Sequence, residues 1–124
     1  MNDERKRGYD YEEVVLTRHA IKRVSQRVGI PKKAVYKYAQ KALKYGVSQK
    51  EAKGKLRNYL DGVYLRYETA NNLRAYNRYV YVFVNERLIT VLYIPKKFHD
   101  TADVQQQKKK FRIEMEELYS EYSR

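Results

Sequence analysis

The apolar positions of the chain reach their highest density between Tyr79 and Pro95. Two runs rich in β-branched and aromatic residues, YVYVFV and LITVLYI, are separated there only by Asn85, Glu86 and Arg87. Alternation along each run places successive side chains on opposite faces, and both faces are largely apolar. The pattern therefore predicts a central β-hairpin that needs cover from other elements.

The chain before this hairpin has helical periodicity instead. Thr17 is a good N-cap for a helix that ends at Gly29, and Pro31 opens a second helix that ends at Gly46. Each helix has one apolar stripe, which we expect to pack on the sheet. The two stripes are Leu16, Ala20, Ile21, Val24 and Val28, then Val35, Tyr38, Ala39, Ala42 and Leu43.

The region between these helices and the hairpin changes its periodicity from helix to strand. Ser48 and Glu51 have capping-box spacing, which predicts a short third helix through Leu60. A turn at Asp61 and Gly62 would end that helix. Strands are then predicted over residues 63–68 (VYLRYE) and 73–76 (LRAY), before a tight turn at Asn77 and Arg78.

These elements predict an α+β fold in which N-terminal helices pack on an antiparallel sheet of three or four strands. We expect a flexible arm over residues 1–13, a single α+β domain over 14–95, and a C-terminal loop and helix over 96–124. The last helix, Val104 to Tyr122, carries one apolar stripe that either packs or projects as a partner-binding tail. That stripe is Phe111, Met115, Leu118 and Tyr122.

The distribution of charge along the chain indicates a class of binding partner, which the length of the chain does not. The formal net charge is +12, and the stretch from Thr17 to Leu60 holds thirteen Lys and Arg against one acid, Glu51. This distribution is typical of a surface that meets phosphate, and RNA is the expected partner. A solvated lysine-rich helical surface is the alternative interpretation. A membrane partner is not expected, because the helices lack a broad apolar face opposite the charge.

Composition also limits the compartment and the chemistry. The chain has no cysteine, no apolar run long enough for a membrane span and no N-terminal apolar segment of the signal-peptide type, so a cytoplasmic location is expected. Metal-ligand, Walker and dinucleotide-binding spacings are missing from the sequence, so no metal or other cofactor is expected.

The best candidate for catalysis is His19, which stands one helical turn before Arg23 and two turns before Arg27. Imidazole can act as acid or base near neutral pH, and a guanidinium can stabilise the charge that builds up on a phosphodiester during metal-free RNA cleavage. Thr90 is the only polar side chain within LITVLYI, with Leu88 and Leu92 as expected same-face neighbours, and is the third candidate catalytic residue. Ordinary helix-surface and strand-forming roles are the alternatives for these residues.

Further residues are candidates for nucleic-acid binding. Lysines and arginines on the expected outer faces of the helices would contact phosphates, and a tyrosine could stack on a base. Asn72 could contact RNA, although turn formation explains it as well. The candidates are Lys22, Arg27, Lys33, Lys37, Lys41, Asn72, Arg74 and Tyr76.

The order TRHAIKRVSQR, a second helix, and strands closing with LITVLYIP resembles the small RelE-like ribonuclease toxins, within the wider barnase, EndoU and colicin group of metal-independent ribonucleases. The resemblance covers about residues 14–95. The chain also resembles a set of small proteins of phages and Gram-positive bacteria, with a similar RHAxxR start, TANN segment and LITVL ending. The resemblance implies that His19 is the general acid or base, that Arg23 and Arg27 contact phosphate, and that Thr90 supplies a hydroxyl.

Three functions are therefore compatible with the sequence. The first is a metal-independent endoribonuclease of toxin type. The second is a non-catalytic nucleic-acid-binding protein, such as a phage regulator or anti-defence factor. The third is a protein-interaction element that binds a partner or inhibitor through the C-terminal helix and the tyrosine-rich sheet.

Overall fold

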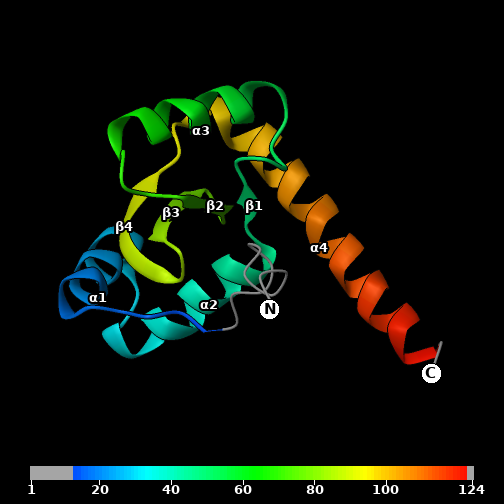
Figure 1. Cartoon of the computed structure of the whole chain (residues 1–124), viewed down its shortest axis with the longest axis horizontal. Helices are drawn as coiled ribbons and strands as arrows, with labels where there is room; N and C mark the ends of the chain where they lie inside the picture. Colours follow the sequence, from blue (N-terminus) through cyan, green and yellow to red (C-terminus); the bar gives the residue numbers. More distant parts are fainter. Residues whose placement is uncertain (1–12, 123–124) are drawn as a thin grey trace.

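A computed structural model describes residues 13–122, which form one four-stranded antiparallel sheet with helices on both faces (Figure 1). This confirms the α+β class. The expected arm over residues 1–13 lies outside the described residues except for Glu13. The elements are α1 (Arg18–Val24), a π-helical turn (Ser25–Gly29), a 3-10 turn (Lys32–Ala34), α2 (Val35–Tyr45), β1 (Val47–Ser48), α3 (Gly54–Arg66), β2 (Asn72–Tyr76), β3 (Tyr79–Val84), β4 (Arg87–Tyr93), a second 3-10 turn (Lys96–Phe98) and α4 (His99–Tyr122).

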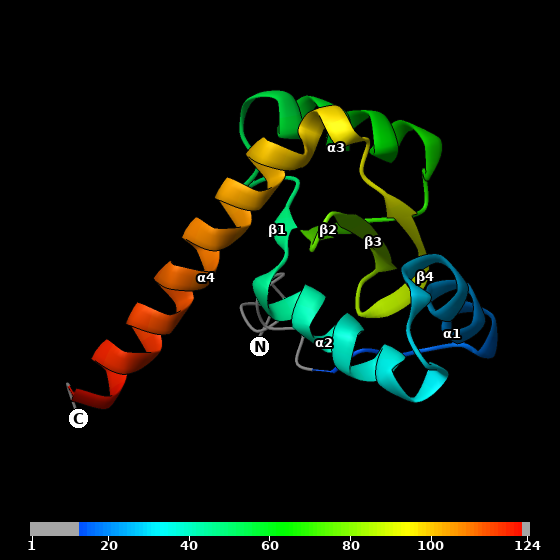
Figure 2. The ribbon, with the colours of Figure 1, turned by 180° about the vertical axis from the view of Figure 1, so that it is seen from behind.

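The sheet separates two apolar clusters, and its strands lie in the order β1-β2-β3-β4. One cluster joins α1 and α2 to the sheet face that carries Tyr81 and Phe83. The other joins α3 and the start of α4 to the face that carries Val80 and Val82. Figures 1 and 2 show the same three layers from opposite sides. Alternation within β3 therefore supplies both cores, as expected for a strand covered on both faces.

The two N-terminal helices agree with the sequence pattern. The hydroxyl of Thr17 accepts a hydrogen bond from the backbone N–H of Ala20 at 3.0 Å, which caps α1. Ala20 and Val24 are fully buried, as are Val35 and Ala39 of α2. These stripes hold both helices against one face of the sheet and turn their charged side chains to solvent.

The central hairpin is present, but a bulge changes which side chains share a face. Val82 pairs with Thr90 whereas Phe83 pairs with Leu88, so Ile89 is an extra residue in β4. Thr90 therefore lies on the face of Val82, and Leu88 lies on the opposite face in the α1–α2 cluster. The prediction that Leu88 and Thr90 share a face was wrong, because period-two alternation fails at a bulge.

The segment between α2 and β2 also differs from the sequence prediction. Ser48 and Glu51 do make capping-box hydrogen bonds, from the N–H of Ser48 to Oε1 of Glu51 at 2.9 Å and from the N–H of Glu51 to Oγ of Ser48 at 3.2 Å. These bonds close a turn after β1, and the helix starts only at Gly54. β1 itself was missed, because two residues carry no readable periodicity.

The turn predicted at Asp61 and Gly62, and the strand over 63–68, were wrong. α3 runs through Gly62 to Arg66, and Leu56, Leu60 and Val63 are buried on one side of it. This i, i+4, i+7 stripe packs on the sheet, and its burial offsets the cost of about 1 kcal/mol for a glycine inside a helix.

α4 begins at His99, five residues before the predicted start. A ring nitrogen of His99 donates to the backbone carbonyl of Ile94 at 2.7 Å, and His99 and Ala102 are buried. The first half of α4 therefore belongs to the folded domain, whereas the second half projects away from it (Figure 1). No helix within residues 13–122 is long and apolar enough to cross a membrane.

Candidate nucleic-acid interface

The layer formed by α1, α2 and the turns between them is positively charged throughout. Residues 17–46 contain nine Lys and Arg and no Asp or Glu. Because the apolar stripes face the sheet, eight of the nine basic side chains are exposed on the outside of the layer. This surface, the α1–α2 basic face, comprises Arg18, Lys22, Arg27, Lys32, Lys33, Lys37, Lys41 and Lys44.

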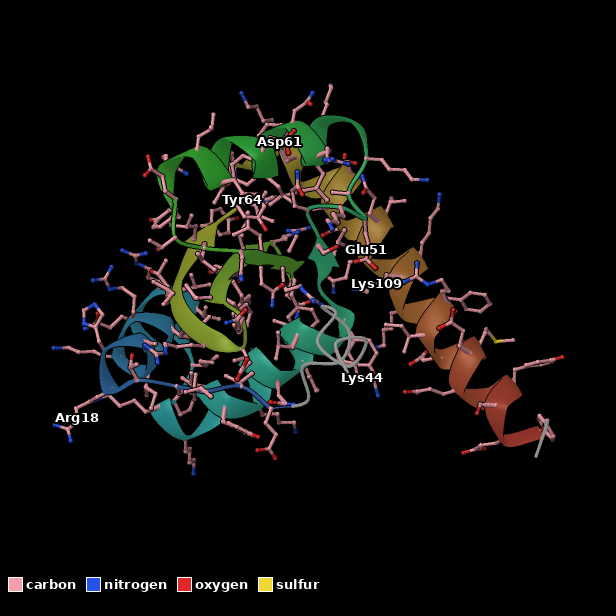
Figure 3. All side chains as sticks on the ribbon, viewed as in Figure 1. Arg18, Lys44, Glu51, Asp61, Tyr64 and Lys109 are labelled. Carbon is pink, nitrogen blue, oxygen red and sulfur yellow. The ribbon has the colours of Figure 1, made fainter. Side chains whose placement is uncertain are left out.

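The basic third of the sequence does not form one continuous surface. Lys50 lies in the turn after β1, and Lys53, Lys55 and Arg57 lie at the start of α3, on the other side of the sheet. Figure 3 labels Arg18 and Lys44 in the α1–α2 layer and Asp61 on α3, across the sheet from them. The sheet thus divides the thirteen cations between two surfaces.

Carboxylates neutralise very little of the α1–α2 basic face. Within residues 13–122, its one ion pair joins Lys44 to Glu117 of α4, with Nζ and Oε2 2.9 Å apart. The hydrogen bond with Glu117 raises the pKa of Lys44. The other cations of the face have no acidic partner in the described range, so their field is available to a polyanion.

His19 and Arg23 contact each other on the exposed side of α1. Nη2 of Arg23 lies 2.7 Å from Nε2 of His19. A guanidinium can only donate hydrogen bonds, so Nε2 accepts and carries no proton in this arrangement. The predicted one-turn relationship therefore gives a direct contact in which the arginine orients the imidazole.

Arg27 lies next to the edge strand β4. Its Nη1 donates to the carbonyl oxygen of Val91 at 2.8 Å and to Oγ1 of Thr90 at 3.3 Å. The hydroxyl of Tyr79 donates to the carbonyl oxygen of Arg27 at 3.3 Å, which ties the π-helical turn to the sheet. Thr90 is 5% exposed. The structure therefore makes two separate pairs, His19–Arg23 and Arg27–Thr90, and the second is largely structural.

Three of the predicted nucleic-acid ligands lie inside the protein. Arg74 is 3% exposed, and it donates to Oδ1 of Asn72 at 2.7 Å and to the carbonyl oxygen of Leu43 at 2.5 Å. Tyr76 packs edge-on against Tyr81, with ring centroids 6.4 Å apart. Arg74, Asn72 and Tyr76 share the face of β2 that α2 covers, so they support the fold and do not reach the basic face.

A largely buried ion pair at the base of α4 was not predicted from the sequence. Nζ of Lys109 donates to Oε1 of Glu51 at 2.7 Å and to the carbonyl oxygen of Gly46 at 2.6 Å, and Nη2 of Arg112 donates to Oε2 of Glu51 at 3.2 Å. Figure 3 shows Glu51 and Lys109 between β1 and α4. Ala102 and Lys109 are seven residues apart, which places both on one side of the helix. This spacing was the one feature of the sequence that could have indicated that Lys109 faces the sheet.

The environment of this pair shifts both pKa values. Burial favours the neutral form of Glu51, but hydrogen bonds from Lys109 and Ser48 outweigh it and lower the pKa of Glu51 to about 2. Burial lowers the pKa of Lys109, and the bond to Glu51 offsets part of that effect. Clefts of about 340 and 640 Å³ flank the pair, and both are lined by Glu51, Arg74 and Lys109.

Comparisons with known proteins add no family. No family model matches the chain, and neither a curated protein nor a solved structure matches it significantly. Among residues 13–122, no group of three or more His, Cys, Asp or Glu side chains is placed to hold a metal ion.

Proposed function

We propose that this protein binds nucleic acid, RNA in the first place, through the α1–α2 basic face. The supporting observation is a helical layer with nine cations and no acid in its sequence, of which only Lys44 is paired with a carboxylate in the described range. Binding of phosphates by such a face releases condensed counterions and so becomes favourable. Lys22, Arg27, Lys33, Lys37 and Lys41 are the predicted phosphate ligands that this face exposes.

Salt dependence tests this proposal directly. A fluorescent single-stranded RNA would be titrated with the protein at several salt concentrations, and the same titration repeated with single-stranded and duplex DNA. We expect the logarithm of the association constant to fall linearly with the logarithm of salt, with a slope of about −0.7 for each phosphate neutralised on a single strand. Affinity that does not change with salt would contradict the proposal.

The contact between His19 and Arg23 favours a second candidate function, metal-independent cleavage of the bound RNA. A phosphate would compete for the Arg23 guanidinium and thereby release Nε2 of His19. Nε2 could then accept the proton of the 2′-hydroxyl while the 2′-oxygen attacks the adjacent phosphorus. The bond to the 5′-oxygen breaks, that oxygen takes a proton from water, and a 2′,3′-cyclic phosphate remains.

In this mechanism the other candidate residues have supporting roles. Arg23 would stabilise the negative charge that develops on the phosphate oxygens. Thr90 is buried, and its hydroxyl would act by holding Arg27 against β4 and not by touching the substrate. A non-catalytic binder, of the kind a phage regulator or anti-defence factor would be, needs the basic face alone.

Cleavage and binding are distinguished by one pair of proteins. Wild type and His19→Ala would be incubated with mixed RNA in EDTA, and the products scored for 2′,3′-cyclic phosphate ends. The enzyme hypothesis predicts fragments with the wild type alone and unchanged RNA retention by the variant. Retention by both proteins without fragments would reject catalysis and leave the binding function.

A further inference from the structure

α4 exposes apolar side chains along the side opposite its packed face, most of them in its projecting half. Ala102 and Lys109 are buried toward the sheet, and helical periodicity places the exposed apolar residues about half a turn away from them. We name these residues the outer stripe of α4. They are Val104, Phe111, Met115, Leu118 and Tyr122, which are 50, 65, 46, 45 and 81% exposed.

The spacing of the outer stripe is that of a helix made to pair with another helix. The steps of 7, 4, 3 and 4 residues follow the alternating positions of a heptad repeat, with Lys108 as the one polar member. The stripe spans about 27 Å at 1.5 Å per residue. A run of this length with five large apolar side chains in water indicates an interaction surface.

Charge along α4 indicates what covers it. The middle of the helix carries only positive charge, and its last ten described residues carry only negative charge. Lys109, Arg112, Glu116 and Glu117 already make ion pairs within the subunit. The charges that a partner helix would meet are therefore the positive ones of Lys108 and Lys110 and the negative ones of Glu114 and Glu121. Two copies of this helix laid antiparallel would set each positive segment beside the negative segment of the other, and would also oppose their helix dipoles.

We propose that the protein forms a two-fold symmetric dimer through antiparallel pairing of the outer stripes of α4. In the register that aligns the two outer stripes along their whole length, Phe111 packs against Met115 of the partner subunit, and Val104 packs against Tyr122 of the partner subunit. The outer stripe lies opposite the packed side of α4, so the two domains stand on opposite sides of the helix pair and do not collide. Such an interface is isologous, as closed dimers require.

The size of the stripe sets the expected affinity. Ten apolar side chains, five from each copy, bury on the order of 1,000 Å² in total, near the lower limit for a specific interface. We therefore expect a dissociation constant in the micromolar range. The dimer does not depend on nucleic-acid binding, because the α1–α2 basic face plays no part in it.

Sedimentation of the full chain over a wide concentration range tests the dimer. The mass should rise from 15.0 kDa toward twice that value. Replacing Phe111 and Leu118 together by Ser should keep the protein monomeric at least tenfold higher in concentration, with an unchanged helix signal because both side chains are exposed. Leu65→Ser is the matched control, because Leu65 is 80% exposed on α3 and should leave the dimer intact.

Cross-linking tests the antiparallel register, and the absence of native cysteine makes it simple. When the Val104→Cys and Tyr122→Cys proteins are mixed and oxidised, they should form a disulfide-linked dimer. Each protein oxidised alone should form little of such a dimer. Efficient linking of Tyr122→Cys to itself would mean a parallel pair and would overturn the proposal. A protein that stays monomeric at all concentrations would also overturn it, and would leave the outer stripe to a different partner.

Discussion

Lys109 of α4 and Glu51 of the turn after β1 form a largely buried ion pair that helps to hold the last helix against the sheet, with Nζ and Oε1 2.7 Å apart. Lys109 is 8% exposed and also donates to the carbonyl of Gly46, so its ammonium group joins α4 to the residues on both sides of β1. Removing one member of such a pair leaves the other charge buried and without compensation, which costs more than the pair contributes.

Glu51→Gln should therefore destabilise the fold by about 1–2 kcal/mol at neutral pH, a range that allows for the partial exposure of the carboxylate. Because the pKa of Glu51 falls from 4.5 to about 2 on folding, its contribution is complete above about pH 5 and is lost as pH falls toward 2. Denaturant unfolding across this pH range should show that the free energies of unfolding of the variant and the wild type become equal in acid. A difference in the free energy of unfolding that stays constant with pH would contradict this role of the Glu51–Lys109 pair. Glu68→Gln is the control, because Glu68 is exposed.

Gly62→Ala should stabilise the protein by about 0.5–1 kcal/mol. Gly62 lies inside α3 and is exposed, and a Cβ built on it meets no atom within 4 Å. Thermal unfolding would measure the gain. Gly62→Pro is the opposing variant and should cost about 3 kcal/mol, since it removes a helical hydrogen bond. If the alanine destabilised and the proline did not, residues 61–62 would form the turn that the sequence suggested.

The error in α3 shows how far the sequence determines the fold. The hairpin, α1 and α2 could be predicted because their periodicity is long and their caps, such as Thr17, are typical. In α3, an Asp-Gly pair looks like a turn, and only packing of Leu60 and Val63 on the finished sheet overrides it. β1 is two residues long, so it exists only because β2 is there to pair with it.

Arg27→Ala should lower stability by about 1 kcal/mol, because the carbonyl of Val91 loses a charged donor on the edge of β4. Thr90→Val should cost less, because the longer bond to Thr90 is the weaker of the two that Arg27 makes there. Urea unfolding of both variants measures these effects, with Lys22→Ala as a neighbouring exposed control. Equal stability of Arg27→Ala and Lys22→Ala would show that Arg27 serves only the surface.

The candidate site was predictable in part for the same physical reasons. Helical spacing was enough to place His19 beside Arg23, because both belong to one element. The position of Thr90 depended on the bulge at Ile89, and the burial of Arg74 depended on how α2 crosses β2. Neither relationship is local in sequence, so no pattern in the sequence could reveal it.

The most direct test of nucleic-acid binding by the α1–α2 basic face compares two variants of equal charge. Lys37→Gln/Lys41→Gln removes two cations from α2, and Lys53→Gln/Lys55→Gln removes two from the other side of the sheet. RNA affinity would be measured for both against salt. We expect the α2 variant to bind at least tenfold more weakly at low salt, with a salt slope shallower by about 1.4, and the α3 variant to match the wild type. Equal losses in the two variants, or a loss confined to the α3 variant, would contradict a binding surface on α1 and α2.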